Sequence, residues 1–383
     1  MLIIPTRRIL IFGFLAFVLI GLEQGILGLF VAELGTQLRR SPEELGLFFA
    51  LHGVGSAIVT GSALIGWLEK RNNKRIAMAS LALSAGGFLV VFGESWTSKL
   101  FAAPLLGIGF GGLSMSFNTL FVTHFSQKNA GLLNVLNATY GLGAVAAPWL
   151  VSTGTYSATQ VFLTVAALSL AVMLGAWGID DRVPSNLPTS SGDKNNAGPV
   201  VPLLFTAFLI LFLEAGLTYW MPSLLADSPQ DEFVAARYMT VFFGWFVIVR
   251  LGAAALATWI STLGFALIGL SGVFASLILV STSFIPLSDT AFIGAFMGLI
   301  FPNAYAWMLM NGHGGIALGA KLLLSAITGA TVGPWVLGWI WPLFGDTAVL
   351  LTLSVTSALS VVIMLRIHFQ TRKILVINQR VGV

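Results

Sequence analysis

The stretch that decides the fold runs from residue 130 to residue 149 and reads AGLLNVLNATYGLGAVAAPW. It is apolar enough to lie in a membrane, yet it carries Asn134, Asn137 and Tyr140, polar groups that hydrocarbon penalises. The two asparagines are three residues apart, so they share one face of a helix. Gly143 then begins a small-residue surface that another helix can approach closely. We therefore interpret the stretch as a membrane helix with one polar face.

The same spacing returns later in the chain. Small and bulky residues of this stretch are repeated in order by a second set: Gly143, Ala144, Pro148 and Trp149 by Gly329, Ala330, Pro334 and Trp335. Two other pairs agree in order: Leu22-Glu23-Gln24-Gly25 with Leu213-Glu214-Ala215-Gly216, and Gly107 and Gly111 with Gly294 and Gly298. Three matches in register predict a duplicated bundle with a solute site between its halves.

Composition places this duplicated chain in a membrane. Of its 383 residues, 57% are hydrophobic and only 9% are charged, and the mean hydropathy is +0.92. Soluble domains carry about 25% charged residues. Apolar runs recur along the whole chain, and about 20 such residues span the hydrocarbon core as a helix. The chain has no cysteine, which excludes disulfides and thiolate metal sites.

We predict an all-α integral membrane protein of 12 transmembrane helices, arranged as two six-helix pseudo-symmetric bundles. The spans are expected at residues 9–32, 45–68, 76–92, 100–125, 130–151, 158–177, 201–225, 235–260, 263–282, 290–310, 316–340 and 347–365. The predicted parts are an N-terminal bundle (1–179), a linker rich in Asp, Pro, Ser, Asn and Gly (180–199), a C-terminal bundle (200–365) and a basic tail (366–383).

Basic residues predict the orientation of the bundle. Outside the spans, thirteen Lys and Arg fall on the side of the two termini, and four fall on the other side: Arg39, Arg40, Lys99 and Arg237. The positive-inside rule then places both termini, the linker and the tail in the cytoplasm. A bacterial inner membrane and a monomer are expected. The excess of basic over acidic residues is explained by these cytoplasmic loops, so we expect no nucleic-acid partner.

The loop at residues 66–75, GWLEKRNNKR, carries a family resemblance. It is similar to the Gly-x-x-x-Asp-Arg-x-Gly-Arg-Arg loop between the second and third helices of the major facilitator superfamily of transporters. Lys70 stands where that family has Asp, and Asn73 where it has Gly. Asn tolerates the left-handed backbone that Gly would supply. The resemblance extends over essentially the whole chain and implies a transporter.

Within that superfamily the chain resembles the fucose-permease-like branch of sugar:proton symporters. The matching segments are LN at 133–134, GLGAVAAP at 141–148, FFG at 242–244, RLG at 250–252 and GLIFP at 298–302. The resemblance implies a carboxylate on helix 4 that works with an acid on helix 1. Here Ser114 holds the first position and Gly25 the second, with Glu23 two residues earlier. The fold therefore carries over, whereas the coupling mechanism does not.

Charged residues deep in the spans are the first site candidates, because such charges are expensive in a bilayer. Glu23 is the leading candidate for proton coupling or substrate contact, with structural pairing as the alternative. Its symmetry mate Glu214 is the second proton-coupling candidate, although a buried pair with Arg250 is the favoured interpretation. Lys321 either snorkels to the cytoplasmic interface, binds an anionic substrate or exchanges partners during transport.

Polar and aromatic residues at similar depth are the substrate-binding candidates. Amides and hydroxyls supply the donors and acceptors that a polar solute needs, and aromatic rings can stack on it. These candidates are Gln24, Asn118, Asn134, Asn137, Tyr140, Tyr305 and Trp307. Hydrogen bonds between helices are the alternative role for the amides. We expect Trp220 to anchor at the membrane interface. His52 is expected to be a hydrogen-bonded packing residue, with a proton relay as the alternative.

The sequence favours a secondary active transporter of a small polar solute, with a sugar as one candidate and protons as candidate coupling ions. The first alternative is an exporter of amphipathic or lipophilic compounds, which the 29 Phe and 11 Trp would suit. The second is a non-transporting sensor or assembly protein on the same fold. No phosphate-binding loop and no metal-ligand spacing is present, so we expect no enzyme, cofactor or metal.

Overall fold

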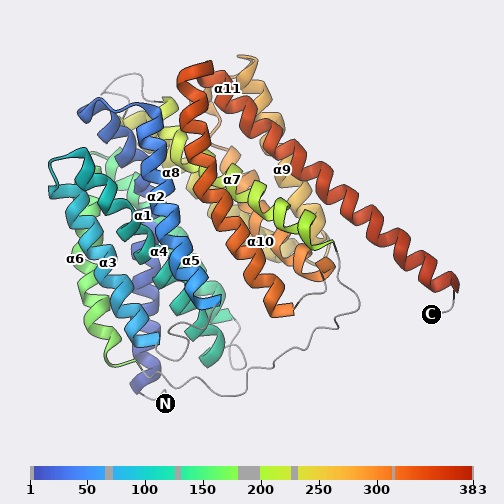
Figure 1. Cartoon of the computed structure of the whole chain (residues 1–383), viewed down its shortest axis with the longest axis horizontal. Helices are drawn as coiled ribbons and strands as arrows, with labels where there is room; N and C mark the ends of the chain where they lie inside the picture. The colour runs from blue at the N-terminus through green and yellow to red at the C-terminus, as the bar shows by residue number, and fades with distance from the viewer. Residues whose placement is uncertain are drawn as a thin grey trace.

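A computed structural model describes residues 4–64, 72–125, 131–179, 199–225, 232–312 and 315–381. Its elements in chain order are α1 Ile4–Leu38, α2 Pro42–Leu64, α3 Asn72–Phe92, α4 Trp96–Phe125, α5 Gly131–Ser152, α6 Ala158–Ala176, α7 Val200–Leu225, α8 Glu232–Leu256, α9 Thr262–Ser281, the 3₁₀ turn η2 Leu287–Asp289, α10 Ile293–Gly312 and α11 Gly315–Val381. Helices α1 to α6 lie mainly on one side of the molecule and the later helices on the other (Figure 1). The first part of the loop at 66–75 and the linker from 180 to 198 lie outside the described residues.

The last helix, α11, contains two membrane crossings. Its apolar part runs over 54 residues, Leu318–Thr371, whereas about 20 residues cross a bilayer. Gly345 interrupts it with φ 78° and ψ 177°, a conformation that favours glycine. The chain turns there, and the two arms both lead away from the turn and diverge (Figure 1). With the ten earlier helices that are long and apolar enough to cross, the prediction of twelve crossings is confirmed.

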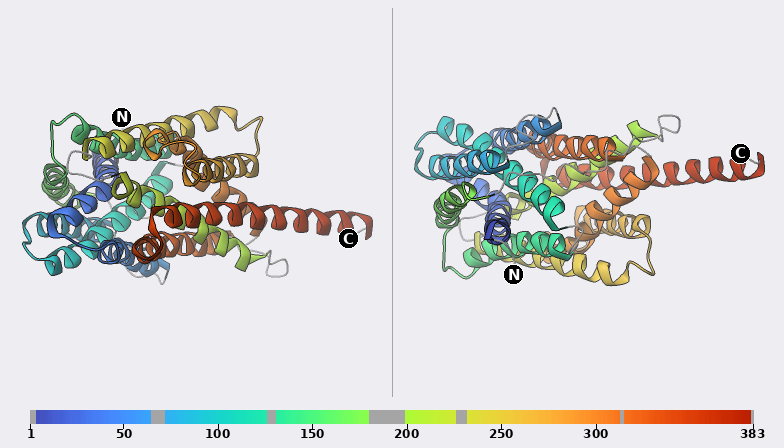
Figure 2. Two further views of the ribbon diagram at one scale, coloured as in Figure 1. Left: turned by 90° about the horizontal axis from the view of Figure 1, so that it is seen from above. Right: turned by 90° about the horizontal axis from the view of Figure 1, so that it is seen from below.

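The second arm of α11 differs from the prediction at its end. A helix was expected at 347–365 and a tail after it, but the helix continues to Val381. No Gly or Pro occurs between residues 366 and 381, so no residue of the helix-breaking type ends it. The arm projects beyond the rest of the bundle (Figure 2).

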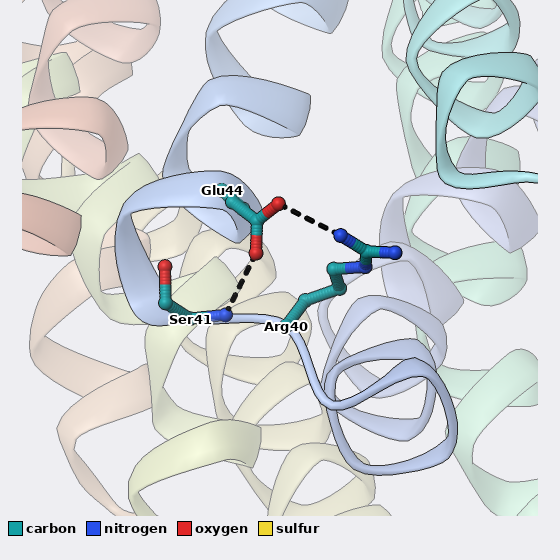
Figure 3. A network of polar contacts seen from close by, with 3 residues as sticks. All are labelled: Arg40, Ser41 and Glu44. Carbon is teal, nitrogen blue, oxygen red and sulfur yellow. Dashed lines mark hydrogen bonds and ion pairs between the residues drawn. The ribbon is translucent and has the colours of Figure 1, made fainter.

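The turn between α1 and α2 is held by a small polar network. Glu44 accepts a hydrogen bond from the Ser41 backbone N–H at 3.1 Å and pairs with Arg40 at 3.0 Å (Figure 3). The first contact satisfies a backbone donor that the start of a helix leaves unpaired. The Arg40 guanidinium also lies over the Trp96 ring, 5.5 Å from its centroid. The turn therefore ties the start of α2 to the start of α4.

Glycines confirm the internal repeat, because equivalent glycines meet equivalent helices. A Cβ at Gly143 of α5 would collide with the Val18 carbonyl oxygen on α1, and one at Gly329 of α11 would collide with the Phe208 carbonyl oxygen on α7. These close approaches need a residue without a side chain. Pro148 does not end α5, which continues to Ser152.

The second pair of repeated glycines behaves in the same way. Gly107 of α4 lies against the His52 carbonyl oxygen on α2, and Gly294 of α10 lies against the Phe242 carbonyl oxygen on α8. Helices α2 and α4 in the first half therefore correspond to α8 and α10 in the second. The six-plus-six arrangement predicted from the sequence repeats is present in three dimensions.

Close contacts between the halves mark the end of the bundle opposite the two termini. Cβ atoms at Gly46 of α2 and Gly338 of α11 would lie 3.1 Å and 2.6 Å from the carbonyl oxygens of Pro334 and Pro42, each in the other half. In contrast, a Cβ at Gly61, near the other end of α2, would meet nothing within 4 Å. The two halves are therefore pressed together at the end where α2 begins.

Candidate functional site

A buried acid and a histidine form the centre of the candidate site. Glu23 of α1 is fully buried, and its Oε1 lies 2.9 Å from Nε2 of His52 on α2, which is itself buried. The other carboxylate oxygen, Oε2, is buried and has no hydrogen-bond partner among the described residues. An unpartnered buried polar atom costs free energy, so it calls for an explanation in function. This acid has a site for one more proton or donor.

Glycines beside Glu23 determine where it points. Cβ atoms at Gly21 and Gly25 would collide with the backbone of α5 at Tyr140 and Ala144, so this face of α1 rests directly on α5. A residue two positions away from a helical residue lies on nearly the opposite face. Glu23, between the two glycines, is therefore directed away from α5. His52 meets it there from α2.

A tyrosine from the second half contacts the site. The Tyr219 hydroxyl of α7 donates to Gln24 Oε1 at 3.3 Å. Its ring stacks on Phe49 of α2 at 4.7 Å between centroids and 7° between planes. The same ring lies edge-on to His52 at 6.5 Å. One residue of the C-terminal half thus contacts α1 and α2 beside the Glu23–His52 pair.

Arginine and glutamate of the second half extend this group of polar side chains. Arg250 of α8 donates from Nε to the Gly298 carbonyl oxygen of α10 at 3.3 Å, and its guanidinium lies 4.0 Å from the Phe246 ring centroid. Glu214 is partly buried, and its Oε2 has no hydrogen-bond partner among the described residues. The expected direct Glu214–Arg250 ion pair is absent from the described contacts, which is a correction. The two charges still interact electrostatically over a longer distance.

Tyr140 lies between the two sets of groups. It is partly buried on α5, and its ring is edge-on to Phe110 of α4 at 6.5 Å. It interacts electrostatically with Glu23, Glu214 and Arg250. We call the set Glu23, Gln24, His52, Tyr140, Glu214, Tyr219 and Arg250 the polar centre. It draws residues from both halves of the molecule.

The remaining asparagine candidates are less central. Asn118 is partly buried on α4. Asn137 is exposed on α5 and has an interaction partner. Asn134 belongs to α5, but its side chain lies outside the described residues. For Asn118, the described contacts include none with the polar centre.

The candidates of α10 and α11 are not in the polar centre. Tyr305 is partly buried, with its ring 5.8 Å from that of Phe301. Trp307 is only 4% exposed and packs in the hydrophobic core, so it presents no free ring face to a solute here. Lys321 is exposed on α11 and forms no described ion pair, so the expectation of an intramembrane charge partner is not supported.

The expectation for Trp220 was wrong. Trp220 is fully buried and donates from Nε1 to the Pro334 carbonyl oxygen of α11 at 2.9 Å, so it is not an interface anchor. His52 is buried and hydrogen-bonded, as expected, and its partner is the acid Glu23. Sequence reasoning also missed Tyr219 and Phe49. The spacing of a helix offered a signal for Phe49, which is three residues before His52 and shares its face, but none for Tyr219, which is five residues after Glu214.

Comparison with known proteins places this arrangement among transport proteins. A family model described as Major Facilitator Superfamily matches residues 13–320. The protein of Bacillus subtilis (strain 168) that carries the name niacin/nicotinamide transporter NiaP is 24% identical over 244 residues, or 58% of this chain. The chain spans 59% of the length of that relative.

Solved structures share the fold at low sequence identity. A D-xylose-proton symporter matches with a TM-score of 0.76 and 14% identity, over 94% of this chain and 97% of that one. The nucleoside transporter NupG gives 0.69 and 14%, over 96% and 98%. A bacterial homologue of the human lysosomal transporter Spinster, inward-facing and unoccupied, gives 0.68 and 13%, over 97% and 98%. All these matches are transport proteins by description, which agrees with the prediction that the chain is not an enzyme.

Proposed function

The chain belongs to the Major Facilitator Superfamily, and from that premise we propose that it is a secondary transporter of a small polar solute. The observation that carries the proposal is the polar centre, in which side chains of both halves meet. Gln24 of the first half and Tyr219 of the second share a hydrogen bond there. A solute bound between two halves can be exposed first to one side of the membrane and then to the other as the halves rock.

Proton coupling is proposed at the Glu23–His52 pair. A carboxylate and an imidazole in contact can hold one proton between them, and an added proton changes the charge of a site from which water is largely excluded. The free Oε2 of Glu23 is the place where that proton, or a donor of the solute, would bind. The pair takes the place of the helix 4 carboxylate of the fucose-permease-like branch, where this chain has Ser114.

Two substrate classes are consistent with the polar centre. A sugar remains the first, since carboxylate, amide and phenol groups together accept and donate hydrogen bonds to hydroxyls. A small aromatic acid or amide is the second. It is favoured by Arg250, a cation without a described ion-pair partner that lies over the Phe246 ring. The relative named as a niacin/nicotinamide transporter supports including this class.

The proposed orientation in the membrane rests on charge, and the proposed conformation rests on the contacts between the halves. With both termini in the cytoplasm of a bacterium, the end where α2 begins faces outward. Because Gly46 and Gly338 hold the halves together at that end, this conformation is closed to the outside. The proposed parts remain 1–179, 180–199 and 200–365, with the tail now a continuation of α11.

Purified protein in liposomes that contain a pH-sensitive dye tests the proposal. We would add sugars, nucleosides and pyridine carboxylates one at a time to wild type and Glu23→Gln, with Glu94→Gln as a matched control. Glu94 is an exposed acid outside the helices. The expected result is acidification by one solute class in wild type and control but not in Glu23→Gln. Solute movement without acidification would refute proton coupling alone.

If folded protein transports no solute of the panel, the small-polar-solute proposal is refuted. An assay with lipophilic cations would then examine the exporter alternative. Flux in neither assay would favour the non-transporting alternative. These outcomes are distinct because radiolabelled solute uptake and dye response are recorded separately.

A further inference from the structure

A pocket outside the polar centre opens on the surface of the second half. It has a volume of about 540 Å³ and lies between α8, η2 and the start of α10. Its lining is mostly apolar and aromatic, with Val241, Trp245 and Phe292 among it, and it includes two charged residues, Arg237 and Asp289. No residue of the polar centre lines it, so it is not part of the solute site.

The pocket is a groove along the outer face of α8. Its α8 residues recur three or four positions apart, which places them on one side of the helix. Val241 and Trp245 on this side are 43% and 44% exposed, whereas Phe242 and Phe246 on the adjacent side are buried where α8 meets α10. Since α8 crosses the membrane, its exposed apolar face is in contact with lipid rather than water.

The length of the groove suits one acyl chain entered from the membrane surface. Arg237 lies near the start of α8, at the end of the bundle opposite the termini, one turn after Phe233, the first lining residue, and Trp245 lies eight residues further along. At 1.5 Å per residue, the part from Arg237 to Trp245 is about 12 Å long, or roughly the outer two fifths of a 30 Å hydrocarbon core. Arg237 and Asp289, at this end of the bundle, are therefore at headgroup level.

Two opposite charges stand at that end without pairing with each other. Arg237 on α8 and Asp289 on η2 are both exposed, and neither forms an ion pair with a described residue. Asp289 accepts only a hydrogen bond from the adjacent Ser288 hydroxyl, at 3.2 Å. Separate cationic and anionic groups match a ligand that carries both charges. A purely anionic headgroup would meet repulsion from Asp289.

We propose that this groove binds one phospholipid with a zwitterionic, primary-amine headgroup. Arg237 binds the phosphate, to which a guanidinium donates well. Asp289 accepts hydrogen bonds from the ammonium group. An acyl chain lies along Val241, Trp245 and Phe292. A trimethylammonium headgroup has the same charges but no N–H to donate, so the site distinguishes the two headgroups.

Native mass spectrometry of the whole protein tests the assignment. Protein would be released from bilayers of equal parts phosphatidylethanolamine, phosphatidylcholine and phosphatidylglycerol, and bound lipid identified. Wild type is expected to retain one phosphatidylethanolamine, about tenfold or more over phosphatidylcholine, as for the loss of one charge-assisted hydrogen bond. Asp289→Asn should remove that preference, and Arg237→Gln should remove retention of all three lipids. Val241→Trp should remove retention by filling the groove.

Arg39→Gln is the matched control, because Arg39 is an exposed cation at the same end of the first half. It should retain lipid as wild type does. Equal retention of the three lipids by wild type would overturn the proposal, as would unchanged retention in Arg237→Gln and Asp289→Asn. The readout is a mass and needs no transport, so it stands or fails separately from the proposed function.

Discussion

At the scale of single residues, the molecule is distinguished by a carboxylate that is buried and half satisfied. Glu23 Oε1 has His52 as its partner, and Oε2 has none among the described residues. Leaving such an atom buried costs about 1–3 kcal/mol. A structural acid would have both oxygens satisfied, as Glu44 does in the α1–α2 turn. The contrast between the two acids supports a functional role for Glu23.

The role of His52 leads to the first residue-scale prediction. His52→Gln keeps a donor for Glu23 but cannot gain a proton. The groups that face the pair are Tyr219 from α7 and Tyr140 from α5, which both titrate near pH 10 in water. We expect solute-driven proton uptake to fall by about tenfold or more, while solute exchange without a gradient continues. His368→Gln, at the far end of α11, is the control. Normal proton uptake in His52→Gln would make His52 a packing residue.

The partner of Glu23 could not be read from the sequence. The depth of Glu23 in the membrane span was evident from the number of residues between it and the start of the helix. Which neighbour it meets depends on the rotation of α1, and Gly21 and Gly25 set that rotation through contacts with α5, more than a hundred residues away. For the same reason the direct Glu214–Arg250 pair was expected and is not formed, because Arg250 turns to Gly298 and Phe246.

At the scale of elements, close helix pairs hold each half together. Gly107 lets α4 lie against α2. A Cβ at Gly107 would collide with the carbonyl oxygen of His52, the residue whose side chain contacts Glu23. Packing and the site are therefore joined in one helix pair. A side chain at Gly107 would push α2 away from α4 and displace the imidazole.

Substitution of this glycine gives the element-scale prediction. Gly107→Val should lower stability by about 1–3 kcal/mol through overpacking, seen as a lower melting temperature in detergent. Gly61→Val on α2 is the matched control, since a Cβ there meets nothing within 4 Å. An equal loss in both variants would mean that the close approach at Gly107 is not responsible, since Val is a better helix former than Gly and helix propensity alone would not lower stability.

Helix positions were largely predictable, and the exceptions have local causes. The α7 prediction, 201–225, differs from the observed Val200–Leu225 by one residue. The start of α10 moved from 290 to Ile293, because η2 and the Thr290 hydroxyl use the preceding residues in a turn. The predicted end of the last helix, at residue 365, was too early. The basic residues that follow suggested a tail, but no helix breaker occurs before residue 381.

At the scale of the whole molecule, the two halves are in contact at one end. Helices α2 and α11 approach closely through Gly46 and Gly338, and Phe49 of α2 stacks on Tyr219 of α7. The proposed alternating access would require these contacts to open. On that proposal, the end where the halves are in contact is the one that separates in the other conformation.

A crosslink at this end provides the whole-molecule prediction. A Cβ at Gly46 would lie 3.3 Å from the Cα of Trp335, which is compatible with the roughly 4.4–6.8 Å Cα separation of a disulfide. The chain has no cysteine of its own, so Gly46→Cys with Trp335→Cys gives a single possible bridge. Oxidation should abolish solute flux in liposomes, and a reductant should restore it. Flux that persists in fully crosslinked protein would show that this end need not open.

The continuous second arm of α11 also makes the protein convenient for imaging. It runs without a helix breaker to Val381 and extends past the bundle (Figure 2). A rigid fusion partner that begins with its own helix could be joined there in register, at 1.5 Å and 100° per residue. Such a marker would keep a fixed direction relative to the membrane helices. Particles of this small membrane protein could then be aligned in electron microscopy through a feature outside the micelle.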